Sequence, residues 1–303
     1  MSSPNKWPSL RVVVIGTYNT NLVIWCDAIP VKGQSILGGD FEMFCGGKGA
    51  NCAVAAARAG CRVKFVGAHG PDTFGKMARE RLDAEGIDIS DFVELPASKT
   101  GVGMFFQERK TAAHAALASS SANNQFSPAL VRKVEPAIRE SDLVFTHFAI
   151  SSSVLLEIYR ICQRHRKRLV VHAEPVKTPI ELPKSCYLMV ANDFEAPLLA
   201  GSDDLKSAVQ KLHRLGVQNV IIKEEHRSLV FSDGTRLRAQ PIPEAPFIQD
   251  AGSMECLATW AGLGLAVSGD LAYATYVGVQ ALAFSFSRRG ALDSAPYLSE
   301  LAI

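Results

Sequence analysis

The sequence lacks the features that would direct a protein to nucleic acid or into a membrane. Its 32 Lys and Arg nearly balance 30 Asp and Glu, and the formal net charge is only +2. It therefore has no concentrated positive charge with which to follow a nucleic-acid backbone. Apolar runs such as residues 263–267 are far shorter than the ~20 residues of a membrane-spanning helix. The polar start, MSSPNKWPSL, has no apolar core of the kind found in a secretion signal.

Disulfide and metal signals are also missing. The seven cysteines are odd in number, scattered and without a C-x-x-C pair, which favours reduced, mostly buried thiols in a cytoplasm. The seven histidines show neither an i, i+4 pair nor an H-x-H spacing, which favours structural or surface roles over a redox or metal protein. We expect a cytoplasmic protein whose partners include neither nucleic acid nor a membrane.

What the sequence does contain is a regular alternation of short β-branched runs and longer helical patterns. A chain of 303 residues can bury a large core, and this alternation is typical of an α/β domain with a parallel sheet covered by helices. The predicted strands are residues 11–15, 63–66, 143–146, 169–171, 187–190 and 220–222. The predicted helices are residues 50–59, 76–85, 154–167 and 203–215.

Two stretches interrupt the alternation. Residues 22–44 and 101–107 read as extended segments with turn signals and no helix between them. They predict a few antiparallel strands outside the main sheet, forming a small flap. Residues 115–124 are rich in small and polar side chains and predict a solvated loop.

A glycine-rich element, residues 45–51 with the sequence CGGKGAN, leads directly into an alanine-rich helical pattern. Glycines at the start of a helix let the backbone approach a ligand and present N–H groups to it. Lys48 and Asn51 can add hydrogen bonds to hydroxyl groups. The spacing matches neither a Walker A loop nor the dinucleotide fingerprint. A binding turn is therefore favoured, and a purely structural turn into the helix is the alternative.

The stretch GGKGANCAVAAARAG resembles the N-terminal signature of the ribokinase-like (PfkB) carbohydrate kinases. The resemblance covers nearly the whole chain: residues 16–21 are similar to the family's G-S-x-N-x-D turn, and residues 67–75 to its G-x-x-G-x-D-x-x-G stretch. Residues 192–195, N-D-F-E, fit its N-x-x-E motif, and residues 127–131 and 289–296 resemble further family segments.

This resemblance implies a single ribokinase-like, Rossmann-type three-layer α/β domain over residues 1–303, with a small β-lid formed by about residues 22–44 and 101–113. It implies transfer of the γ-phosphoryl group of ATP to a sugar or nucleoside hydroxyl, with Mg²⁺ and ATP as cofactors. Glu195 would organise the metal. The implied substrate-binding residues are Asn19, Asn21, Gly46, Gly47, Lys48 and Asn51, and the implied nucleotide-binding residues are Asn192, Lys223, Glu225 and Asp250. A homodimer could form through apolar lid residues, 43–44 and 104–106, which could instead face the sugar.

The sequence departs from the family in its catalytic motif. Where the family has D-T-x-G-A-G-D, ending in the Asp that deprotonates the sugar hydroxyl, residues 250–256 read D-A-G-S-M-E-C. Depending on the alignment, Cys256, Ser253 or Glu255 takes the place of that Asp, and Gly252 and Ser253 lie in the anion-binding turn. Only Glu255 is ionised at neutral pH. A carboxylate that simply favours the helix N-terminus is the alternative reading of Glu255, and bulky Met254 enters the turn in every alignment.

Other departures affect the nucleotide and sugar sides. The family's T-x-G-x-x-G is replaced at residues 223–228 by K-E-E-H-R-S, which removes both glycines and adds Glu224 and Glu225. Asn21 replaces a sugar-binding Asp, and Ala149 lies near the position of a sugar-contacting Glu. These losses count against ordinary use of ATP and Mg²⁺. They lead to the hypothesis of a ribokinase-fold protein with weak or lost kinase activity; the alternative is an active kinase that uses Glu255 as its base.

Overall fold

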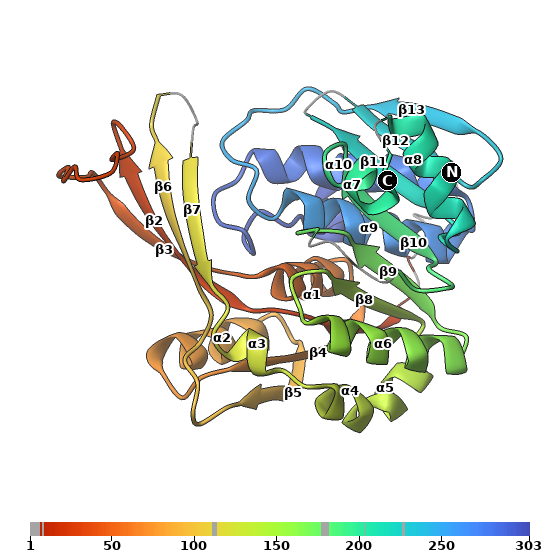
Figure 1. Cartoon of the computed structure of the whole chain (residues 1–303), viewed down its shortest axis with the longest axis horizontal. Helices are drawn as coiled ribbons and strands as arrows, with labels where there is room; N and C mark the ends of the chain where they lie inside the picture. Colours follow the sequence, from red (N-terminus) through yellow and green to blue (C-terminus); the bar gives the residue numbers. More distant parts are fainter. Residues whose placement is uncertain (1–6, 8, 111–113, 177–181, 203, 226–227) are drawn as a thin grey trace.

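The structure is a computed structural model that describes all residues except 1–6, 8, 111–113, 177–181, 203 and 226–227. The described residues form a large sheet with helices on both faces, and a second, smaller sheet that extends from one end (Figure 1). The helices and the large sheet make three layers, which confirms the predicted ribokinase-like α/β class.

The large sheet has nine described strands in the order β13-β12-β11-β10-β9-β8-β1-β4-β5. Neighbours from β11 through β5 are parallel, whereas β12 and β13 add an antiparallel edge. The chain moves from β1 to β4 on one side and later to β8 on the other, so the strand order reverses at β1, the usual position of a ligand crevice. The strands are β1 (Arg11–Ile15), β4 (Arg62–His69), β5 (Asp88–Glu94), β8 (Leu143–His147), β9 (Arg168–His172), β10 (Leu188–Asn192), β11 (Val220–Glu224), β12 (Ser228–Ser232) and β13 (Leu237–Pro241).

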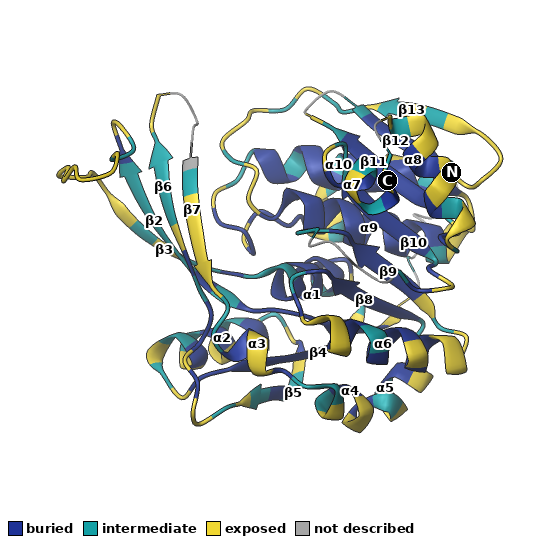
Figure 2. Ribbon diagram, viewed as in Figure 1, coloured by how far each residue is buried: buried dark blue, intermediate teal, exposed yellow. Residues whose placement is uncertain are grey.

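Two apolar cores lie on opposite faces of this sheet (Figure 2). Alternate side chains of β1 enter different cores: Val12 and Val14 enter one, and Val13 and Ile15 the other. The first core includes residues of α1 (Lys48–Arg58), α2 (Thr73–Asp83), α9 (Ser253–Ser268) and α10 (Leu271–Phe286). The second includes residues of α3 (Ala122–Gln125), α4 (Pro128–Lys133), α5 (Glu135–Glu140), α6 (Ser152–Arg164), α7 (Glu195–Ala200) and α8 (Leu205–Arg214).

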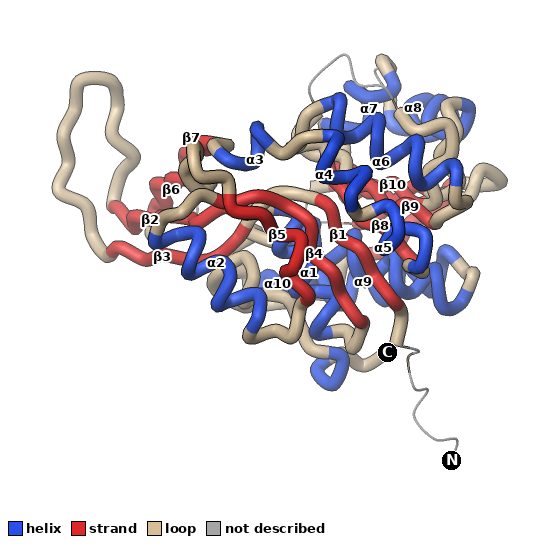
Figure 3. The backbone as a smooth tube through the Cα atoms, turned by 90° about the horizontal axis from the view of Figure 1, so that it is seen from below, coloured by secondary structure: helices blue, strands red, loops and turns tan. Residues whose placement is uncertain are grey.

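The smaller sheet, called the lid sheet below, has the order β3-β2-β6-β7. It consists of β2 (Asn19–Cys26), β3 (Phe41–Gly46), β6 (Val102–Glu108) and β7 (His114–Ser119). The expectation of antiparallel strands is wrong for one pair, because β2 and β6 run parallel. Residues 111–113 of the predicted lid lie outside the described residues. Figure 3 shows the long connection between β2 and β3 projecting away from the large sheet.

The sequence correctly predicted several helices and strands outside the lid sheet. All six predicted strands and all four predicted helices are present, with shifts of a few residues at their ends. The loop predicted at residues 115–124 is wrong: this stretch contains most of β7, paired antiparallel with β6, and most of α3. Pairing with β6 overrides the weak strand propensity of its Ala and Ser residues.

The cysteines agree with the expectation of reduced, mostly buried thiols. All seven cysteines are described and free, and five of them are buried: Cys26, Cys52, Cys162, Cys186 and Cys256. None of the described helices has both the length and the apolar character needed to cross a membrane.

Candidate active site

The glycine-rich element fits tightly against the turn that follows β1. Gly47 has a φ of +98°, and a Cβ there would lie 2.6 Å from the backbone nitrogen of Asn19. A Cβ on Gly49 would lie 2.7 Å from the backbone of Gly16. The N–H of Ala50 donates to the carbonyl of Thr17 at 3.1 Å. These glycines therefore bring the start of α1 against the chain itself, so a packing requirement accounts for part of the motif.

The residues expected to bind sugar gather where the lid sheet meets α1. Asn19 on β2 is paired in register with Gly46 on β3. A Cβ on Gly46 would lie 2.5 Å from Nδ2 of Asn21. Buried Asn123 donates from Nδ2 to Oδ1 of Asn19 at 3.0 Å. Lys48 and Asn51 follow in the first turn of α1, and Gly47 joins β3 to that helix, so the six predicted residues lie on or between three adjoining elements.

The first turn of α9 distinguishes the three candidates for the family's catalytic Asp position. Gly252, with a φ of +84°, precedes the helix. The Ser253 hydroxyl donates to the Asp250 carboxylate. Cys256 is a buried member of the apolar core, and burial raises the pKa of its thiol far above the usual range. Glu255 contacts a predicted sugar-binding residue on α1: Nδ2 of Asn51 donates to its Oε2 at 3.2 Å.

Glu255 belongs to a group of four charges, called the charged cluster below: buried His172 and Glu255, and partly buried Lys48 and Glu174. Lys48 Nζ lies 2.8 Å from Glu174 Oε1 and 3.4 Å from Glu255 Oε1. His172 Nδ1 lies 3.1 Å from Glu255 Oε1, and its Nε2 lies 3.2 Å from Glu174 Oε2. The cluster joins the start of α1, the carboxyl end of β9 and the start of α9.

The ionisation of the cluster follows from these contacts. Burial alone would lower the pKa of Lys48, but Glu255 and Glu174 outweigh it and hold that pKa above its usual range. Burial alone would raise the pKa of Glu255, but Lys48 and His172 lower it to about 2. Burial opposes the charged form of His172, and the two carboxylates raise its pKa to about 9. At neutral pH the cluster therefore holds two positive and two negative charges.

Glu195, expected from the family resemblance to organise the metal, is a further buried carboxyl beside this cluster. Burial, with the negative charge of Glu174, raises its pKa to about 7. Its Oε2 has no hydrogen-bond partner among the described residues. Asn51 Oδ1 and both ring nitrogens of His172 are likewise buried without a hydrogen bond. The His172 contacts of 3.1 and 3.2 Å are thus electrostatic and lack the alignment of hydrogen bonds.

The four residues expected to hold nucleotide are each engaged by another group of the protein. Lys223 Nζ lies 3.1 Å from Asp250 Oδ2. Asn192 Oδ1 accepts from the backbone N–H of Glu195 at 2.8 Å and supports the start of α7. Glu225 has a φ of +40°, and its N–H donates to Asp193 Oδ2 at 3.2 Å. Residues 226 and 227 of the expected nucleotide loop lie outside the described part.

Sequence reasoning missed His172 and Glu174, and it expected structural or surface roles for the histidines. Both residues follow a predicted strand, and the carboxyl ends of parallel strands are where α/β proteins bind ligands. The pattern H-x-E directly after residues 169–171 was the available signal. By contrast Ala149, near the position of a sugar-contacting Glu, only donates its backbone N–H to His147 Nδ1 at 3.0 Å.

Known carbohydrate kinases resemble this chain in sequence and in fold. The ribokinase of Haemophilus influenzae is 30% identical over 217 residues, which cover 70% of this chain and 71% of that protein. The ribokinase of Lactococcus lactis is 25% identical over 296 residues, covering 96% of this chain and 95% of that protein. The structure of Giardia lamblia ribokinase superimposes with a TM-score of 0.87 at 22% identity, covering 96% of this chain and 98% of that one.

Arabidopsis thaliana ribokinase, solved with ribose and ATP, has a TM-score of 0.83 at 20% identity, with 95% and 96% of the two chains covered. The sequence profile of the pfkB family carbohydrate kinases matches residues 9–252. On this match the chain belongs to the pfkB family of carbohydrate kinases.

Proposed function

We propose that this protein is a ribokinase-fold carbohydrate kinase homologue that retains a site for a sugar, nucleoside or related polyol and has weak or lost phosphoryl transfer. It acts as one unit over residues 1–303, with the lid sheet covering the polyol. The observation that carries the proposal is the engagement of Glu255 by Lys48 and His172. The carboxylate that can take the place of the family's catalytic Asp in the sequence is thus already neutralised by the protein itself.

Two properties of Glu255 support weak catalysis. A general base works best when its pKa lies near the working pH, whereas the cluster lowers that of Glu255 to about 2. The same contacts occupy Lys48 and Asn51, which by resemblance would hold the hydroxyl groups of the substrate. A polyol has to displace these contacts to bind, which weakens its binding relative to a free site.

ATP and Mg²⁺, which the family uses, fit the residues on the nucleotide side poorly. Phosphates are bound by positive charge or by free backbone N–H groups. The Lys223 ammonium is paired with Asp250, and the Glu225 N–H is used by Asp193. Glu195, Asn192 and Asp250 remain as the residues that would face a metal-bound phosphate group, and we assign them no step of the reaction.

The first test is an ATP-coupled assay with ribose, deoxyribose, fructose and nucleosides at high protein concentration. We expect turnover below about 1 s⁻¹, the low end of the range for kinases. Ribose or another bound polyol at 100 times its Kd should stabilise the fold by ~2.7 kcal/mol in thermal unfolding, while ATP should have little effect. Asn21→Ala should reduce the polyol effect, and Asn124→Ala, on an exposed position of α3, should not.

Turnover well above that limit would favour the alternative, an active sugar or nucleoside kinase with Glu255 as its base. In that case Glu255→Gln would abolish turnover without changing sugar affinity. In a protein without kinase activity, the same change would have no turnover to abolish.

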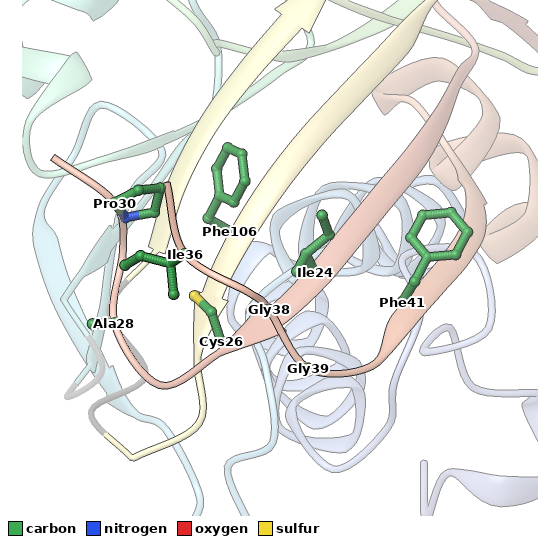
Figure 4. A pocket seen from close by; sticks show the side chains of 9 residues that line it. All are labelled: Ile24, Cys26, Ala28, Pro30, Ile36, Gly38, Gly39, Phe41 and Phe106. Carbon is green, nitrogen blue, oxygen red and sulfur yellow. The ribbon is translucent and has the colours of Figure 1, made fainter. Parts of the chain in front are cut away.

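We further propose, as a separate prediction, that the lid sheet pairs two copies of this cytoplasmic protein. Large apolar side chains are exposed there, including Phe41 at 60% and Leu117 at 76%. Phe41 also lines an apolar hollow of the same sheet (Figure 4), together with Ile24, Cys26, Ala28, Pro30, Ile36, Gly38, Gly39 and Phe106, none of which belongs to the charged cluster. Exposed apolar patches of this kind support an interface.

Light scattering should give twice the monomer mass, and Phe41→Asp with Leu117→Asp should halve it. Leu237→Asp, at an exposed apolar position on β13, is the matched control and should leave the mass unchanged. A wild-type monomer would contradict the pairing, and these apolar side chains would then be left to face the substrate.

A further inference from the structure

We propose that His172, Glu174 and Glu255 form a binding site for a divalent transition-metal ion of the Zn²⁺ class. Each residue offers one ligand atom, and these atoms all lie within 4.8 Å of one another. The site is distinct in residues and chemistry from the magnesium role implied for Glu195. It shares Glu255 with the proposed polyol site and lies against Lys48, but it requires neither sugar nor ATP, so a metal titration tests it separately from the proposed function.

The backbone holds the three residues in a rigid setting. His172 is the last residue of β9, a strand paired on both sides within the large sheet. Glu174 follows two residues later, and Glu255 lies in the first turn of α9. Only 1% of the His172 side chain and 5% of the Glu255 side chain are exposed, so neighbouring packing restricts both ligands. Glu174 is about one-third exposed and leaves a path for the ion.

The donor set and spacing suit such an ion. One imidazole nitrogen and two carboxylate oxygens, with water in a fourth position, are common ligands of Zn²⁺. Tetrahedral bonds of about 2.1 Å separate ligand atoms by roughly 3.4 Å. His172 Nδ1 already lies 3.1 Å from Glu255 Oε1, close to this separation. Glu174 contacts the opposite nitrogen, Nε2, at 3.2 Å and has to turn toward the ion, which its partial exposure allows.

Buried atoms without partners provide an independent indication of a ligand. Both His172 nitrogens, Asn51 Oδ1 and Glu195 Oε2 are buried and lack a hydrogen bond among the described residues. Buried polar atoms are nearly always satisfied, and exceptions point to a missing water or ion. Asn51 and Glu195 offer oxygens to a hydrated cation next to its three ligands. An apolar or anionic ligand would satisfy none of these oxygens.

Lys48 is the group that opposes the ion. Its ammonium lies 2.8 Å from Glu174 and 3.4 Å from Glu255, so it neutralises the same carboxylates that the metal would bind. An ion that binds His172 displaces the proton of the imidazole, which leaves the two carboxylates of Glu174 and Glu255 against the single positive charge of Lys48. A divalent ion balances this excess. Removing the Lys48 charge should therefore strengthen metal binding, whereas it should not affect ions held elsewhere on the surface.

The experiment is a titration of the full-length, chelator-treated protein with Co²⁺, whose visible absorption reports a low-coordinate nitrogen and oxygen site. We expect saturation at one equivalent without sugar or ATP. His172→Gln and Glu174→Gln should each weaken binding at least about tenfold, as even indirect changes at metal sites do. Lys48→Met should tighten binding. Excess Mg²⁺ should not displace Co²⁺, because an imidazole ligand disfavours Mg²⁺.

The matched control is His165→Gln, which alters another histidine paired with a glutamate, at 2.7 Å from Glu135. It should leave Co²⁺ binding unchanged. Glu174→Gln keeps the experiment decisive if His172→Gln fails to fold, because Glu174 is partly exposed. The proposal is wrong if the wild-type protein gives no low-coordinate Co²⁺ spectrum, or if Glu174→Gln binds Co²⁺ as well as the wild type. Sugar phosphorylation by the metal-free protein would refute the proposed function and leave this result intact.

Discussion

Replacing Glu255 by glutamine is expected to lower the free energy of unfolding of the metal-free protein by about 3–5 kcal/mol. Breaking a buried ion pair costs this much because the partner charges stay buried without compensation. Here the substitution removes one negative charge from beside two cations, Lys48 and His172. Urea unfolding in the presence of a chelator would measure the loss as a lower midpoint with an unchanged slope.

Two further variants separate loss of charge balance from loss of contacts. Glu135→Gln removes a glutamate that also pairs with a cation and a histidine, Arg164 and His165, but in partly exposed surroundings. It should change stability little. Lys48→Met added to Glu255→Gln should recover part of the loss, because it removes a charge that the first change leaves unpaired. A double variant less stable than Glu255→Gln alone would contradict this explanation.

The stability of the metal-free protein should also fall by about 3 kcal/mol between pH 6.5 and pH 9 because of His172. Its pKa rises from 6.5 to about 9 on folding, so the folded protein binds this proton more tightly than the unfolded chain. The stabilisation is complete below pH 6.5 and is lost as the pH rises through 9. On the acid side, the lowered pKa of Glu255 removes stability as the pH falls from about 4.5 toward 2.

Other groups around the cluster titrate in different ranges. The raised pKa of Glu195 adds an earlier loss of stability between about pH 4.5 and pH 7, because the folded state favours its protonated form. The pKa of His147 is lowered to about 3 by burial and by the positive charges of Lys48 and His172. His172 is isolated by comparing the wild type with His172→Gln. The difference between them should shrink above pH 6.5, and a constant difference up to pH 9 would be the contrary result.

Much of the fold could be predicted because the spacing of apolar residues within a single helix or strand indicates which of the two it forms. Strands such as β1 and helices such as α6 carry apolar residues on the face or faces that they bury, and the sequence displays that periodicity directly. Helices α9 and α10 were not predicted. They are buried over most of their length and apolar on all sides, so no one-sided pattern marks them.

The site was predictable only in part, because its residues come from segments that are far apart in the sequence. Lys48 and Asn51 lie in one short motif, and Glu255 was one of three candidates for a single position in another. Their contact with one another, and with His172 and Glu174, depends on the approach of α1, β9 and α9, which lie far apart in the chain. No spacing rule for histidines covers a ligand set divided between a strand end and a distant helix.

The lid sheet is joined by very short connections to the residues of the proposed polyol site. Asn19 and Asn21 lie on β2, and Gly46 ends β3 immediately before Gly47 and Lys48. No flexible linker separates the sheet from these residues, because β2 follows β1 after three residues and α1 begins two residues after β3 ends. Three of the six residues that we propose to contact a polyol therefore belong to the lid sheet itself. If the sheet tilts, these three residues must move with it, so closing the lid and repositioning the ligand would be a single movement.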